Sequence, residues 1–230
     1  MKKRTTIKQP RRILALVLVV YIFFMSWFII KNNEQNNLES ITGLNTGEVR
    51  VSILPRCNIP VQAGFNLISV CANLSNTSIL NALNSVEGKY SFVLQLNETS
   101  QAFDVFDPGA ATNPFDTFDI NKSYFVFMTE AATLSFFGVP IGNISVPLHE
   151  EFTAPSYPYT FTTNITRYLD PIAENVSFLL KWNTSSQDFI VFSPEAAEHD
   201  FENISKGEGQ FMYLITPNGV LHYNTSQLQP

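Results

Sequence analysis

The chain has few of the residues that build cystine-stapled folds or catalytic centres. Its 230 residues include two cysteines and three histidines. Two cysteines can form a single disulfide, which excludes a fold held by a cystine framework. The histidines, His149, His199 and His222, lie far apart, and no G-x-S-x-G motif is present. We therefore expect no catalytic residues, no cofactor and no enzymatic activity.

Positive charge is also scarce over most of the chain. Six of the 14 basic residues lie within residues 1–12, and residues 32–230 contain seven basic residues against all 20 acidic ones, a net charge of −13. Binding to nucleic acid needs clustered lysine and arginine. This distribution excludes a nucleic-acid partner and predicts a solvated, anionic surface.

A single long hydrophobic run is present at residues 13–30. Eighteen residues span about 27 Å as a helix, close to the hydrocarbon thickness of a bilayer. The run predicts a transmembrane helix with the lipid bilayer as partner, and the basic tail at 1–12 places the N-terminus in the cytoplasm. The alternative is a cleaved signal peptide, but bulky residues fill 27–30, where a cleavage site needs small ones. Residues 32–230 are then expected outside the cell membrane.

The polar, Asn-rich segment 31–47 has the composition of a stalk. Beyond it, 49–54 predicts a strand. Cys57 and Cys71 are expected to form one disulfide, because the outside of the cell is oxidising. A hairpin with a three-residue loop would place the two cysteines opposite each other. The alternative is a pair of buried free thiols.

An internal repeat organises the external part. A shift of 86 residues aligns 89–111 with 175–197 without a gap, and 12 of the 23 positions are identical. We expect a first repeat at 48–138 and a second at 139–230.

Alternating apolar residues predict that each repeat is mainly β. The strands expected in the two copies are 90–96 and 176–182, 103–106 and 189–192, 123–128 and 210–215, and 132–136 and 219–223. Helical spacing occurs at 78–86. Its counterpart near 164–173 contains Asp170-Pro171, which predicts a short helix there. The expected fold class is mainly β (α+β): an N-terminal transmembrane helix followed by two tandem β-rich repeats, each with one short helix.

Three stretches resemble a known family. AGFNLISVCANLSNTSILNALNSV (63–86), FDVFDP (103–108) and INKSYFVFM (120–128) are similar to the repeated GWNLIS-type domains of archaeal and bacterial cell-surface proteins. KGEGQFMYL (206–214) looks like the last strand of such a domain in the second repeat, whereas EFTAPSYP (151–158) has lost the opening motif. The resemblance implies a β-rich envelope module and no activity.

Ten N-x-S/T sequons are the strongest chemical signal. All lie beyond the hydrophobic run, roughly threefold more than chance placement of the Asn, Ser and Thr residues would give. Such an excess on one side of an anchor predicts N-glycosylation. The sequon asparagines are Asn73, Asn76, Asn97, Asn121, Asn143, Asn164, Asn175, Asn183, Asn203 and Asn224. Asn97 and Asn183 fall in predicted hairpin turns and are expected to be occupied, whereas Asn175, at the start of a strand, is a poorer acceptor.

Other polar clusters and the aromatic residues give weaker signals. A Ca²⁺ site near 104–119 would use Asp104, Asp107, Asp116 and Asp119, but their spacing matches no defined loop. A second group, Glu195, Glu198 and His199, would share a face if 193–200 were helical. We expect no metal at either. The aromatic residues Phe92, Phe103, Phe106, Phe125, Phe127, Trp182 and Tyr213 could line a sugar platform, but their alternation favours a core.

Together these patterns predict a non-enzymatic, N-glycosylated, membrane-anchored envelope protein that acts as a structural or interaction module. A sugar- or protein-binding adhesin or receptor is the alternative, and an extracytoplasmic enzyme a distant one. Envelope proteins or glycans are the expected external partners.

Overall fold

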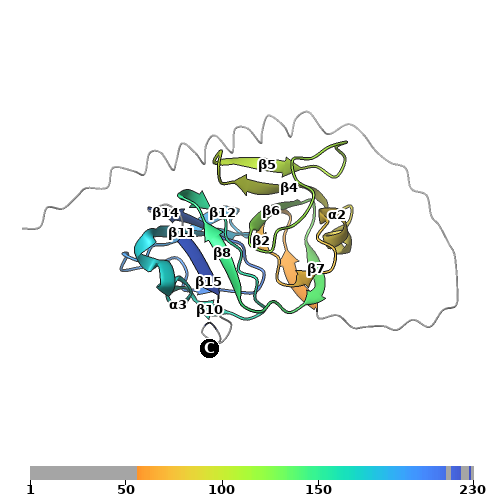
Figure 1. Ribbon diagram of the computed structural model, residues 1–230. Coiled ribbons are helices and arrows are strands. Elements are labelled where there is room, and N and C mark those ends of the chain that lie inside the picture. Colours follow the sequence, from red (N-terminus) through yellow and green to blue (C-terminus); the bar gives the residue numbers. More distant parts are fainter. Residues whose placement is uncertain (1–55, 216–218, 224–227, 229–230) are drawn as a thin grey trace, which may run out of the picture. The chain divides into compact units, whose positions relative to one another are not determined.

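The structure of the protein is a computed structural model that describes residues 56–215, 219–223 and 228 (Figure 1). All of them belong to one compact unit, 51–230. The hydrophobic run at 13–30, the stalk, the strand predicted at 49–54 and Asn224 lie outside the described residues. Within the described ranges, no helix is long and apolar enough to cross a membrane.

The described part is mainly β, as predicted. The strands of the first repeat are β1 (Arg56–Val61), β2 (Gly64–Ser69), β3 (Asn73–Leu74), β4 (Tyr90–Asn97), β5 (Ala102–Phe106), β6 (Ser123–Met128) and β7 (Ala132–Val139). Those of the second are β8 (Ile144–Leu148), β9 (Glu151–Thr153), β10 (Thr163–Asn164), β11 (Val176–Asn183), β12 (Asp188–Phe192), β13 (Asn203–Ile204), β14 (Phe211–Leu214) and β15 (Gly219–Tyr223). The helical segments are α2 (Ile79–Ala82), η1 (Asn84–Val86), α3 (Ile165–Leu169) and η2 (Asp170–Asn175).

Each repeat is built around a four-stranded antiparallel sheet. The strand order is β2-β6-β4-β5 in the first repeat and β9-β14-β11-β12 in the second. Figure 1 shows the β4–β5 hairpin at one margin of the first sheet. Smaller sheets, β1-β7-β3, β15-β8 and β10-β13, complete the described part.

The two hairpins have the same register at an offset of 86 residues. Val93 pairs with Phe106 in the first repeat, and Leu179 pairs with Phe192 in the second. An irregularity near the start of β4 recurs at the same place in β11. The predicted superposition of one hairpin on the other is therefore confirmed, turn over turn.

The outer strands match at an offset of 87 instead. The pair Ile59–Leu134, between β1 and β7, corresponds to Val146–Leu221, between β8 and β15. A shift of one residue moves a side chain to the opposite face of a strand. The offset of 87 keeps the buried residues of both repeats on their core faces.

The same offset locates the opening strand of the second repeat. Gly64 begins β2 and Glu151 begins β9, and their φ angles are +95° and +67°. Glycine adopts a positive φ without steric cost, whereas glutamate does so rarely. Phe65 and Phe152 follow them, so the second repeat keeps this strand although its opening motif is lost from the sequence.

Each four-stranded sheet covers a separate hydrophobic core with one face. In the first repeat Val93, Tyr124 and Val126 turn inward onto Leu83 and Phe136. The second core gathers Leu179, Met212 and Leu221 with residues of α3 and η2. The opposite faces carry Phe65 and Phe125 in one repeat, in ring contact with Trp182 of the other.

The helical segments are shorter than their sequence spacing predicts. The helix expected at 78–86 divides into α2 and η1, and Ser78 at its N-cap accepts no side-chain capping bond. The prediction of a short helix near Asp170-Pro171 is confirmed: α3 ends at Leu169, and η2 continues the chain. Asn164 caps α3, since its Oδ1 accepts from the Thr166 N–H at 2.9 Å.

Candidate functional site

The second repeat closes the free edge of β2. Gly209 donates its N–H to the Leu67 carbonyl at 3.0 Å, and Ser69 donates its own to the Gly207 carbonyl at 2.9 Å. A Cβ on Gly209 would lie within 3.0 Å of backbone atoms of Ile68, which explains the glycine at this position. The contact is therefore a short backbone ladder between repeats.

The first repeat closes the free edge of β9 in the equivalent way. Ser123 donates its N–H to the Ala154 carbonyl at 2.7 Å, and Ser156 donates to the Asn121 carbonyl at 3.0 Å. These four residues correspond to those of the other ladder at offsets of 86 and 87. The two repeats thus contact each other through a pseudo-two-fold arrangement, in which each covers the edge of the other.

Two turn glutamines extend both ladders. Gln187 accepts the Phe65 N–H at 2.7 Å and donates its side-chain amide to the Phe65 carbonyl at 3.1 Å. Gln101 makes the same pair of bonds with Phe152, at 3.1 and 3.0 Å. Both glutamines have positive φ, +54° and +55°. The sequence reasoning missed this role, and the signal was the identical Gln that ends NETSQ and NTSSQ.

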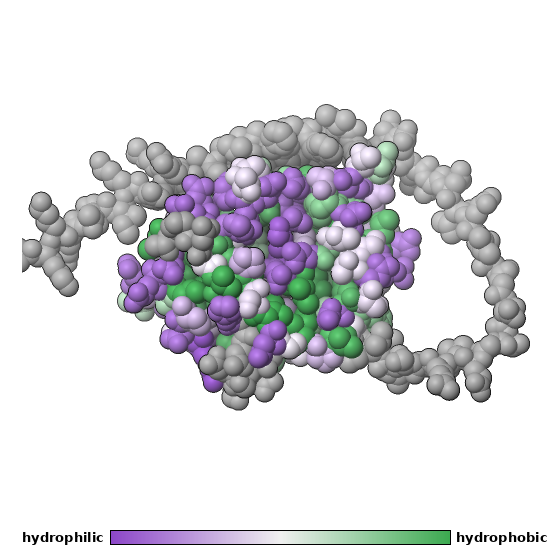
Figure 2. All heavy atoms as spheres, viewed as in Figure 1, coloured by the Kyte–Doolittle hydropathy of each residue, from purple (hydrophilic) through white to green (hydrophobic). Residues whose placement is uncertain are grey.

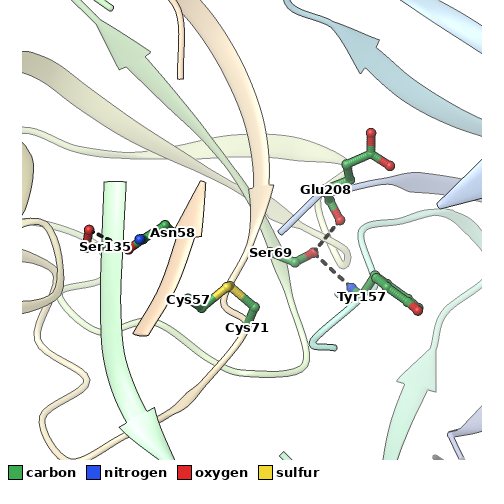
Figure 3. Close-up of a disulfide and its surroundings, with 7 residues drawn as sticks. All are labelled: Cys57, Asn58, Ser69, Cys71, Ser135, Tyr157 and Glu208. Carbon is green, nitrogen blue, oxygen red and sulfur yellow. Dashed lines mark hydrogen bonds between the residues drawn. A yellow bond between two sulfur atoms is a disulfide. The ribbon is translucent and has the colours of Figure 1, made fainter. Parts of the chain in front are cut away.

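A buried serine lies at the centre of the contact between repeats (Figure 3). Ser69 is fully buried; its Oγ accepts from the Tyr157 N–H and donates to the Glu208 carbonyl, each at 2.9 Å. Its counterpart Ser156 donates to the Ile120 carbonyl at 2.5 Å. The hydroxyls of Ser69, Ser123 and Ser156 each have a partner, whereas Oε1 of the buried Gln210, whose N–H donates to Ser123, has none among the described residues.

The predicted disulfide is present beside this serine, but not in the predicted hairpin. Cys57 and Cys71 are bonded, with a Cα–Cα distance of 5.9 Å, and both are buried (Figure 3). Cys57 lies in β1 opposite Phe136 of β7, whereas β2, which precedes Cys71, pairs with β6. The hairpin register was therefore wrong. The bridge instead joins two sheets across the core of the first repeat.

The aromatic residues mostly pack between the repeats or in a core. Phe106 and Phe125 are buried, and Phe125 meets Trp182 edge to face at 5.2 Å. The Trp182 indole N–H donates to the Phe65 carbonyl at 2.8 Å, which satisfies its one polar group. On the face in Figure 2, hydrophobic residues form separate patches among hydrophilic ones. These contacts fit the core interpretation better than a sugar platform.

None of the nine described sequon asparagines is buried. Five are exposed: Asn73, Asn76, Asn143, Asn164 and Asn203. Four are half-buried: Asn97, Asn121, Asn175 and Asn183. By contrast Asn66, which belongs to no sequon, is 2% exposed. The sequons therefore occupy positions from which a glycan can leave the fold.

Asn97 and Asn183 are the last residues of β4 and β11, one step before the turns in which they were predicted, and their half-buried side chains organise those turns. The Oδ1 of Asn183 accepts from the Ser185 N–H at 3.0 Å, and that of Asn97 from the Thr99 N–H at 3.2 Å. In addition, Asn97 donates from Nδ2 to Asp104 at 3.3 Å. A glycosylated Nδ2 keeps one hydrogen, so this bond remains possible after modification.

The sequon at Asn121 differs from the others. Its hydroxyl belongs to Ser123, which is 1% exposed and donates to the Pro155 carbonyl at 2.7 Å within the contact between repeats. Oligosaccharide transfer depends on a free sequon hydroxyl. Asn121 is thus available for modification only before the repeats dock.

The structure does not gather the acidic residues into a metal site. Asp107 caps the Gly109 N–H at 2.8 Å, and Asp119 accepts from the Asn121 N–H at 2.9 Å. Over the described ranges, no three His, Cys, Asp or Glu side chains form a group that could hold a metal ion. Residues 193–200 are not helical, so Glu195, Glu198 and His199 share no helix face.

The free energy of unfolding is expected to fall at alkaline pH because three tyrosines are buried. Burial raises the pKa of Tyr159 to about 12 and holds the pKa values of Tyr124 and Tyr157 well above 10. Above pH 10 the unfolded chain has lost these protons while the folded one retains them, so stability is unaffected below that pH and falls above it. We expect a loss of about 1.4 kcal/mol per tyrosine and pH unit between pH 10 and 12. Urea denaturation at pH 9, 10.5 and 11.5 measures it; equal unfolding free energies would contradict the assignment.

Comparison with known proteins adds no relative: no family model, no curated protein and no solved structure matches the chain. The resemblance to GWNLIS-type domains therefore stays a prediction.

Proposed function

We propose that the protein is an N-glycosylated, single-pass membrane protein of the cell envelope whose two external repeats act as a non-enzymatic structural or interaction module. The observation that carries this proposal is the placement of the sequons. Nine of the ten lie in the described part, and all nine asparagines are exposed or half-buried. The surplus of sequons in the sequence and the surface positions of their asparagines in the fold both support an extracytoplasmic compartment in which N-glycans are added.

Two further features support an extracytoplasmic location. The buried bond between Cys57 and Cys71 is of the kind that persists in oxidising compartments. The hydrophobic run at 13–30 follows six basic residues and precedes every sequon. Retention of the basic side in the cytoplasm would place residues 32–230 outside.

Each repeat uses its sheet edge to bind the other rather than to form a cleft. The ladders at Ser69 and Ser156 and the glutamine contacts use the backbone groups of both edges in bonds between the repeats. Such an arrangement suits a rigid external module. A rigid module on a stalk presents its surface, glycans included, to neighbouring envelope components.

Protease treatment of intact cells tests the topology. With an epitope tag at each end, we expect added protease to remove the C-terminal tag and to leave the N-terminal tag protected, because only the latter lies in the cytoplasm. Detergent lysis before digestion provides the control, since it should expose both tags. A C-terminal tag that survives until lysis would overturn the proposed topology.

A further inference from the structure

Three of the four outer edges of the two main sheets are closed by hydrogen bonds. The other repeat covers β2 and β9. The edge of β12 is closed locally: Asp200 accepts the Val191 N–H at 2.8 Å and donates its own N–H to the Val191 carbonyl at 3.2 Å. Asp188 accepts the Phe189 N–H at 2.7 Å. Unpaired edge groups invite pairing with another strand, and these contacts remove them.

Within the part of the chain that the structure describes, the fourth edge, β5, is open. Phe103 and Val105 occupy the places of Phe189 and Val191 in the same register, so their backbone N–H and C=O groups point away from β4. Among the residues that the structure describes, no donor or acceptor meets these groups. The reason lies in the sequence. Ala102 and Pro114 stand where the second repeat has Asp188 and Asp200, and neither carries a carboxylate.

The side chains of β5 do little to discourage pairing. Natural edge strands are commonly protected by lysine, proline or a bulge. The strand AFDVF contains none of these, and Val105 is 36% exposed. Its one charge, Asp104, is held by the Asn97 side chain.

We propose that the glycan on Asn97 guards this edge and prevents the β5 strand of a second molecule from adding to it. The proposal rests on the glycosylation put forward above. The Nδ2 atom that would carry the glycan lies 3.3 Å from Asp104 Oδ2, in the middle of β5. Neighbouring strands lie about 4.8 Å apart, so the first sugars start within one strand spacing of the open edge.

A second molecule is the expected occupant of the unguarded edge. Two identical edge strands can pair antiparallel about a two-fold axis, and such self-complementary contacts generate most homodimers. A register centred on Val105 sets Asp104 opposite Phe106 rather than opposite its own copy. Like charges directly opposed would destabilise the alternative register.

The test removes one glycan at a time from the full-length protein, purified from a glycosylating host in detergent. Thr99→Ala abolishes the Asn97 sequon but keeps Asn97 and its bond to Asp104. Ser185→Ala abolishes the Asn183 sequon in the equivalent turn, next to the closed edge of β12. Both hydroxyl residues are exposed. We expect Thr99→Ala to dimerise with a dissociation constant at least tenfold lower by sedimentation, and Ser185→Ala to behave as the wild type.

A second variant distinguishes edge pairing from general instability. Adding Val105→Lys to Thr99→Ala places a charge on the open edge and should restore the wild-type dissociation constant. Persistent association in this double variant, or unchanged association in Thr99→Ala, would overturn the inference. An unmodified Asn97 in a protein with glycans elsewhere would also overturn it, while the proposed function stands. A wild-type protein without any glycan would contradict the proposed function itself.

Discussion

Replacement of Phe125 by alanine is expected to lower the free energy of unfolding by about 3–5 kcal/mol, the range for large-to-small changes at buried aromatic sites. Phe125 is 6% exposed in the central strand β6. Its ring lies within 6.1 Å of the rings of Phe103, Phe189 and Phe211 and 5.2 Å from that of Trp182. The cavity would open between the repeats, where both sheets would lose contacts.

Chemical denaturation of the Phe125→Ala variant measures this loss. Phe137→Ala is the control, because that ring is 44% exposed on β7 and its removal should cost about 1 kcal/mol or less. Equal costs for the two variants would mean that the aromatic contact between repeats contributes little. Unfolding in two separate transitions in the Phe125 variant alone would show that this contact couples the repeats.

Removal of the disulfide is the second change with a large expected effect. The double variant Cys57→Ala/Cys71→Ala should lose about 2–3 kcal/mol, because the bond closes a short loop in the unfolded chain. The bond also joins β1 to the end of β2 across a core. The loss should fall on the first repeat, since the second has Ile144 and Pro158 at the corresponding positions.

Denaturation in the presence and absence of a reductant checks this expectation. The wild type should lose stability on reduction, and the double variant should not respond. Hydrogen exchange would locate the loss in β1, β2 and β7. A response of similar size in the variant would show that reduction acts elsewhere.

Local features of the sequence were enough to predict the hairpins. The alternation of apolar and polar residues in β4 and β11 and the polar turns that follow Asn97 and Asn183 are short-range signals. Each signal occurs twice because the sequence contains two copies of the repeat. The strand β6 was also predicted with its observed bounds, because SYFVFM is a continuous apolar run of strand length. The order of the strands within each sheet was not predicted and comes from the structure.

The pairing of β1 and β2 could not be obtained in this way. Proximity in the sequence suggested a hairpin, but Ile59 pairs with Leu134 and Leu67 with Phe125, both far away along the chain. Loop length limits which strands can form a hairpin but does not say which do. The disulfide itself was predicted correctly, but the hairpin that was expected to bring the cysteines together does not form. In the structure the bond joins two different sheets.

The contact between repeats was also invisible to local reasoning. Hydrogen bonds such as those between Gln187 and Phe65 join residues more than 100 positions apart. The break of the helix after Ala82 has a local cause, since Asn84 and Ser85 are weak helix formers that compete for backbone hydrogen bonds.

Site-resolved glycopeptide mapping of the native protein tests the central claim most directly. We expect glycans on the five exposed sequon asparagines and on the two at the hairpin turns: Asn73, Asn76, Asn143, Asn164, Asn203, Asn97 and Asn183. The intact mass should then exceed the 25.9 kDa of the bare chain by discrete glycan increments. Unmodified asparagine in all of these peptides, from cells that glycosylate other proteins, would contradict the proposal of a glycosylated envelope module.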